Sequence, residues 1–148
     1  MSDHAVTHVY EDRFGAVIDH ADVGYVEIRW YDTTEAMSKE QFEDWLAGFA
    51  GAVERLRQAG ILVDGTRFLM DPDNNDMQWR DAHIVPRYNA AGVKKFAFHM
   101  PEGMPAIGTP PSREGPAEYP TAYFARREEA LDWLASTDDA STGTQAKE

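Results

Sequence analysis

Cysteine is absent from the 148 residues of the chain, which excludes disulfide bonds, thiolate metal ligands and a cysteine nucleophile. Long apolar runs are absent as well, since no stretch approaches the roughly 18 apolar residues that a membrane-spanning helix requires. The first residues also lack the basic segment and apolar run of a secretory signal. From these absences we expect a cytoplasmic protein without a membrane span.

Basic residues are scarce. The 14 lysines and arginines face 26 aspartates and glutamates, which gives a formal net charge of -12. Such a chain repels a phosphate backbone or an anionic membrane unless a local basic patch overrides the overall field. We therefore expect neither nucleic acid nor a membrane as a partner, and the acidity favours solubility.

The composition is that of a globular protein, with 43% hydrophobic and 27% charged residues. The length fits one domain that buries its own core. We predict a single α/β domain over residues 1–136. Residues 137–148 are small and polar, so we predict that they form a disordered tail.

Three short strands are predicted at the start of the domain, over residues 6–12, 14–19 and 24–31. The third has the alternation with period two that indicates a strand with one apolar face. Its apolar positions are Val26, Ile28 and Trp30, and the positions between them are Tyr25, Glu27, Arg29 and Tyr31. The domain is therefore expected to open with antiparallel strands.

A helix is predicted over about 39–59, because six apolar residues recur at the spacing of one helical face. They are Phe42, Trp45, Leu46, Phe49, Val53 and Leu56. Ser38 followed by Gln41 forms a capping-box pattern at the start. Gly60 is expected to take the left-handed conformation after the last turn.

The rest of the domain alternates strands and helices. Ile61-Leu62-Val63 is typical of a strand buried on both faces, and it ends at Asp64-Gly65. A helix over 77–91 ends at Gly92, and Pro86 predicts a kink or a division into two short helices. Strands over 94–100 and 121–124 and a helix over 126–136 complete the pattern.

The segment 101–118 is rich in proline and glycine, and we expect no regular structure in it. Connections of this length in compact domains are either functional loops or disordered insertions. Arg113 and Glu114 lie at its expected tip, where they either close over a site or remain in solvent.

The order of these elements resembles that of the STAS (SpoIIAA-like) superfamily. Three segments carry the resemblance: Ile61-Leu62-Val63-Asp64, Lys94-Lys95-Phe96-Ala97-Phe98, and Tyr123 to Leu134 with its Glu-Glu-Ala-Leu-x-Trp-Leu motif. The resemblance implies a single mixed β-sheet with crossover helices. Phosphorylated members carry a serine at the head of the helix after the central strand, whereas residues 71–76 contain neither serine nor threonine. Switching by serine phosphorylation is therefore not expected.

Two groups of residues are candidates for a site. Asp64 and His99 end neighbouring predicted strands, where ligands bind in open parallel sheets, although an acid before glycine also caps turns and a strand-end histidine also packs. Arg80, His83 and Arg87 would form a basic stripe on an unbroken helix. That stripe could hold a carboxylate or phosphate, or it could be a solvated face paired with nearby acids.

The other aromatic and histidine residues of interest are not expected to form a site. Trp45, Trp79 and Tyr88 are expected to pack in the core. His4 and His8 are spaced as a helical metal pair, but they precede or lie in a strand, where that spacing does not converge. No phosphate-binding or nucleophile motif is present, so we expect neither a metal nor a cofactor.

Two functions follow from the sequence. The first is a STAS-like module that binds a small anionic metabolite or a protein partner. The second is a small enzyme in which Asp64 or His99 acts as general acid or base while Arg80, His83 and Arg87, with Arg113 as a further ligand-binding candidate, orient an anionic substrate. Apolar residues beside the basic stripe also predict a homodimer.

Overall fold

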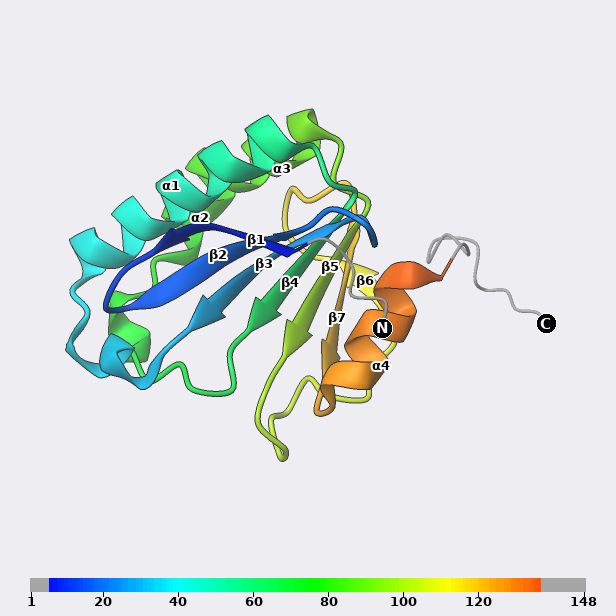
Figure 1. Cartoon of the computed structure of the whole chain (residues 1–148). Coiled ribbons are helices and arrows are strands. Elements are labelled where there is room, and N and C mark those ends of the chain that lie inside the picture. Colours follow the sequence, from blue (N-terminus) through cyan, green and yellow to red (C-terminus); the bar gives the residue numbers. More distant parts are fainter. Residues whose placement is uncertain (1–5, 137–148) are drawn as a thin grey trace.

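Seven strands form one mixed sheet in the order β1-β2-β3-β4-β5-β7-β6 in the computed structural model, which describes residues 6–136 (Figure 1). The first three strands are antiparallel neighbours: β1 (Val6–Glu11), β2 (Gly15–His20) and β3 (Tyr25–Trp30). The predicted antiparallel opening and the single mixed sheet are therefore confirmed.

Three parallel strands continue the sheet from β3. They are β4 (Gly60–Asp64), β5 (Lys95–His99) and β7 (Pro120–Phe124). Each parallel pair needs a crossover connection. The connection from β3 to β4 and the connection from β4 to β5 both contain helices. The expected burial of Ile61-Leu62-Val63 on both faces of the sheet is confirmed, because these residues are 0%, 0% and 7% exposed.

Helices cover both faces of the sheet (Figure 1). Three of them lie on one face: α1 (Lys39–Leu56), α2 (Met77–His83) and α3 (Val85–Ala91). The fourth, α4 (Arg127–Ala135), covers the other face. Two short 3-10 helices, η1 (Asp32–Ala36) and η2 (Pro72–Asn74), lie in the connections. No helix within residues 6–136 is long and apolar enough to cross a membrane.

The predicted capping box begins α1. The Ser38 hydroxyl accepts a hydrogen bond from the Gln41 amide at 3.1 Å, and the Gln41 side chain accepts one from the Ser38 amide at 2.9 Å. These two bonds satisfy backbone donors that have no partner inside the helix. Both the start and the cap of α1 are as predicted.

The end of α1 differs from the prediction. The helix ends at Leu56, and Arg57 rather than Gly60 takes the left-handed conformation, with φ of 56°. Gly60 instead begins β4, where a Cβ would lie 3.1 Å from the Tyr25 side chain and 3.2 Å from Leu134. Glycine is therefore favoured here by close packing against other elements and not by the helix end.

The helix predicted over 77–91 is divided at the proline, as expected. Pro86 lies in the first turn of α3, where it needs no amide hydrogen, and Ile84 separates the two helices. Gly92 ends α3 in the left-handed conformation with φ of 90°. This division changes the direction in which the side chains of α2 and α3 point.

The predicted apolar face of β3 is buried, with Val26, Ile28 and Trp30 at most 4% exposed. The second face is covered as well, because α4 packs on it and leaves Tyr25 and Glu27 only 4% and 0% exposed. Tyr25 packs there in a small apolar cluster with Leu62, Ala97 and Ala130. The larger core lies on the opposite face, beneath α1, α2 and α3.

The segment 101–118 contains regular structure, contrary to expectation. A two-residue strand, β6 (Ser112–Arg113), pairs antiparallel with β7 and forms the last strand of the sheet. The backbone of β6 pairs with the outer edge of β7, whose hydrogen-bonding groups would otherwise lack partners in the sheet. The Tyr123 hydroxyl also donates to the Glu114 carboxylate at 2.8 Å, so Glu114 is held against the sheet.

Removing the Ser38 cap should destabilise the domain without changing its fold. We expect Ser38→Ala to lower the free energy of unfolding by about 1 kcal/mol, because the Gln41 amide loses its acceptor. Ser38→Asp is the matched control, since aspartate caps helices as well as serine does. Equal stability of the two variants in urea unfolding would contradict the assigned role of Ser38.

Candidate functional site

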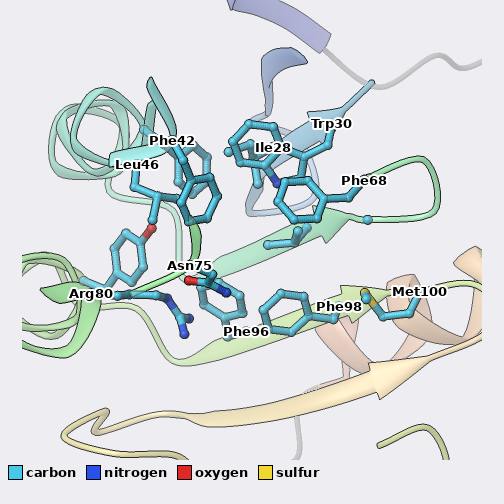
Figure 2. Close-up of a pocket in the computed structure, with 14 residues that line it drawn as sticks. Ile28, Trp30, Phe42, Leu46, Phe68, Asn75, Arg80, Phe96, Phe98 and Met100 are labelled. Atoms are coloured by element: carbon cyan, nitrogen blue, oxygen red, sulfur yellow. The ribbon is translucent and has the colours of Figure 1, made fainter. Parts of the chain in front are cut away.

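A cavity of about 190 Å³ lies between the sheet and the helices α1 to α3 (Figure 2). Alternation along the strands sends Ile28, Val63, Phe96 and Phe98 into it. Aromatic residues make up half of the 14 lining residues. They are Trp30, Phe42, Phe49, Phe68, Tyr88, Phe96 and Phe98. The cavity therefore offers a mainly aromatic environment near the carboxyl ends of β3, β4 and β5.

Arg80 brings a positive charge to this apolar wall. Its guanidinium carbon lies 5.8 Å from the centre of the Phe96 ring. Arg80 and Asn75 are at one end of the group of side chains, and Met100 is at the other (Figure 2). No carboxylate among residues 6–136 forms an ion pair with Arg80, whose further contact is with the Met77 sulfur at 4.0 Å. The cavity is therefore lined mainly by aromatic rings, and the one arginine in its lining has no ion-pair partner among residues 6–136.

Three tyrosine hydroxyls lie within the electrostatic influence of Arg80. Burial raises the pKa of Tyr88, Tyr119 and Tyr123 well above the ordinary value of 10.0, while the charge of Arg80 lowers it by a smaller amount. All three hydroxyls keep their protons at neutral pH and can act as donors. Of the three, Tyr88 lines the cavity, whereas the Tyr123 hydroxyl donates to Glu114 outside it.

The three residues of the predicted basic stripe do not gather. His83 is exposed, with its ring 5.5 Å from that of Trp79. Arg87 instead reaches α1, where its guanidinium donates to both carboxylate oxygens of Glu54 at 2.7 and 2.9 Å. This hydrogen-bonded pair raises the pKa of Arg87 and lowers that of Glu54. Only Arg80 of the stripe lines the cavity, because the break between α2 and α3 interrupts the helical register.

Asp64 and His99 lie on the opposite face of the sheet from the cavity. They are register partners in β4 and β5, and the His99 Nδ1 lies 4.0 Å from an Asp64 oxygen. Asp64 also accepts hydrogen bonds from the Thr66 amide and hydroxyl at 3.2 and 2.8 Å, which fits the turn-capping interpretation. The two residues are close to each other but are separated by the sheet from Arg80.

A buried ionic cluster beside Asp64 was not anticipated from the sequence. Glu27 is 0% exposed, and its carboxylate binds Arg127 of α4 through two hydrogen bonds of 2.8 and 3.1 Å. His20 and Arg29 contact the same carboxylate at 2.9 and 3.1 Å. Burial alone would raise the pKa of Glu27, but these hydrogen bonds and the two arginine charges together lower it well below its ordinary value. Glu27 is therefore ionised in the folded protein.

The remaining candidates lie in several places. Arg113 is exposed in β6 and lines a hollow with Gly60 and Lys95, at the amino-terminal ends of the strands and away from Arg80. His8 lies in β1, and His4 is outside the described residues. Trp45 and Tyr88 are buried in the core as expected, and Trp79 packs partly buried against it.

Comparisons of the chain with protein-family models, with curated proteins and with solved structures found no match.

Glu27 gives a test of the buried cluster. A carboxylate with a lowered pKa stabilises the fold above the pKa of the unfolded state, near 4.5, and this contribution is lost as the pH falls below that value. We expect Glu27→Gln to cost about 3 kcal/mol of unfolding free energy at pH 7, because Arg127 loses its charged partner. The difference from the unsubstituted protein should shrink at pH 3.

Urea unfolding at the two pH values measures this difference. Glu118→Gln is the control, since Glu118 is exposed and its replacement should change stability little at either pH. A cost of Glu27→Gln that is the same at pH 3 and pH 7 would show that the charge of Glu27 is not what stabilises the cluster.

Proposed function

We propose that this chain is a STAS-like binding module whose ligand is a small organic anion with an apolar body. The observation that carries the proposal is the aromatic cavity with Arg80 in its wall and no ion-pair partner for Arg80 within residues 6–136. Concave apolar sites with a few convergent polar groups are the usual form of small-molecule sites. Arginine suits the anionic end because its guanidinium binds a carboxylate through two hydrogen bonds.

The arrangement of the elements supports the STAS-like part of the proposal. Antiparallel strands precede a parallel set, and α1 and the α2–α3 pair make the crossovers on one face. The cavity opens near the carboxyl ends of these parallel strands, which is where open α/β sheets bind ligands. Residues 71–76 contain no serine or threonine, so a phosphorylation switch at that position is not part of the proposal.

The enzyme hypothesis receives less support. It required Asp64 or His99 to act on a substrate held by Arg80, His83 and Arg87, but the sheet separates the acid and base candidates from Arg80. A general acid or base must lie within hydrogen-bond reach of the group it serves. The geometry therefore favours binding over catalysis by this set of residues.

Arg80 provides the direct test of anion binding. We expect benzoate or hexanoate, measured by isothermal titration calorimetry, to bind the unsubstituted protein, and Arg80→Gln to weaken that binding by about tenfold or more, because a charge-assisted hydrogen bond is lost. Acetate should bind more weakly than either, since it cannot fill the cavity. Arg87→Gln is the matched control, because Arg87 is paired with Glu54 and should not affect affinity.

Two results would contradict the proposal. One is that neither benzoate nor hexanoate binds. The other is that Arg80→Gln and Arg87→Gln reduce affinity equally, which would indicate a general effect of surface charge and not a site in the cavity.

Homodimerisation stays a prediction. Leu69, in the connection that follows β4, and Met77, on α2, are 53% and 46% exposed and leave apolar side chains on the surface. Association that covers such surface should give the mass of two chains in light scattering at high micromolar concentration, and Met77→Lys should shift the protein toward the monomer. A monomeric mass for the unsubstituted protein at that concentration would remove the prediction.

A further inference from the structure

A second hollow, a groove of about 650 Å³, lies between α1, the outer strand β1 and the turn that follows β1. β1 forms one border of the sheet (Figure 1). Phe14, Val17, Trp45 and Phe49 give the groove its apolar lining. Phe49 lines the aromatic cavity as well, whereas the other lining residues of the groove do not. The groove is therefore a separate site from the one proposed for a small anion.

The strand beside the groove has an edge without a neighbouring strand. β1 comes first in the order of the sheet, so within residues 6–136 no strand pairs with its outer side. Its six residues include neither proline nor lysine, which commonly protect the edges of sheets. Val6 and Tyr10 are 45% and 52% exposed. The outer backbone groups of β1 are therefore available to an added strand.

An irregularity in β1 turns Tyr10 toward the groove. The pairing with β2 shifts register between His8 and Tyr10, as it does at a β-bulge. Val9 packs against the larger core, and the ring of the next residue, Tyr10, meets Trp45 edge to face with 5.3 Å between the centroids. The groove thus adjoins the outer edge of β1. Because side chains alternate along a strand, one added to this edge would direct every second side chain toward the groove.

Gly48 leaves the helical wall of the groove open. It lies inside α1, where glycine is less favourable than alanine. It is exposed, and a Cβ at this position would meet no atom within 4 Å. Packing inside the described part of the chain therefore does not require glycine here. Close approach of another backbone would favour it, because a side chain would occupy the same space.

The polar lining of the groove is mainly acidic. Asp12 accepts hydrogen bonds from neutral donors, among them the Tyr10 hydroxyl at 2.8 Å and the Trp45 indole at 3.1 Å. Within residues 6–136, neither Asp12 nor the exposed Asp44 forms an ion pair. Arg13 also lines the groove, with its guanidinium over an aromatic ring at 4.6 Å. Two carboxylates and one guanidinium, in a chain of net charge -12, favour a basic ligand.

We propose that the groove binds an extended, basic peptide segment of a partner protein. The segment adds a strand to the outer edge of β1 and places an apolar side chain against Trp45, flanked by lysine or arginine near Asp12 and Asp44. Backbone hydrogen bonds to β1 supply affinity, and the groove selects the side chains. The inference does not depend on the proposed function, because the two sites are separate.

Synthetic heptapeptides test the charge and the addition of a strand. Acetyl-Thr-Lys-Thr-Leu-Thr-Lys-Thr-amide presents leucine and both lysines on one face of a strand. Calorimetry should detect its binding at concentrations up to about 1 mM. The peptide with glutamate in place of both lysines should bind at least about tenfold more weakly, because it meets carboxylates of like charge.

Methylation of the peptide backbone tests the hydrogen bonds to β1. Two versions of the lysine peptide are methylated on alternate backbone nitrogens, which a strand directs to opposite edges. One version should lose binding, because its donors face β1, and the other should keep the affinity of the unmodified peptide. Equal affinity of the two versions would overturn the addition of a strand.

Gly48→Leu tests the place of binding. It should weaken binding of the lysine peptide by about tenfold or more, because the new side chain fills the groove. It should also raise the melting temperature by about 4 °C, because leucine favours a helix more than glycine does. Gly51→Ala is the matched control on the same helix outside the groove, and it should raise the melting temperature without changing affinity.

The remaining outcomes decide the identity of the occupant. No binding of the lysine peptide, equal binding of the lysine and glutamate peptides, or unchanged affinity in Gly48→Leu would overturn the proposal. A dimer in light scattering that Gly48→Leu dissociates and Met77→Lys does not would identify a second copy of the chain as the occupant, and would also overturn it. Benzoate binding is measured independently, so either proposal can fail while the other stands.

Discussion

The fold depends on the burial of the parallel strands from both sides. β4 has strands at both edges, α1 to α3 on one face and α4 on the other, so its residues Ile61 to Val63 lose nearly all contact with solvent. Such a strand tolerates only apolar side chains or polar groups with partners in the protein. The same constraint explains why Glu27, on the neighbouring strand, is paired with Arg127 and His20.

Local signals in the sequence predicted local structure well. Ser38 and Gln41 lie three residues apart, and Pro86 acts on the turn that contains it, so each can be interpreted from its immediate neighbours. Partners distant in sequence could not be found in this way. Glu27 and Arg127 are 100 positions apart, and the tight space around Gly60 comes from Tyr25 and Leu134 in other elements.

The same difference between local and long-range signals applies to the candidate site. Arg80 was predicted as an anion-binding residue because of its charge, but its grouping with His83 and Arg87 assumed one continuous helix. The cavity itself is assembled from side chains of strands, three helices and three connections, including Phe68 and Met100. No pattern of spacing along the chain brings such residues together, so the cavity became visible only in the fold.

The division between α2 and α3 also bears on how a molecule would enter the cavity. None of the seven residues of α2 is buried, whereas α3 buries Val85, Tyr88 and Ala91. Local opening of α2 would therefore cost much less free energy than global unfolding, and its amide hydrogens would exchange with solvent faster than those of α3. Arg80 is on α2, so local opening of α2 would uncover the cavity and also move the guanidinium charge away from it. Closing of α2 would bring the charge back to the cavity.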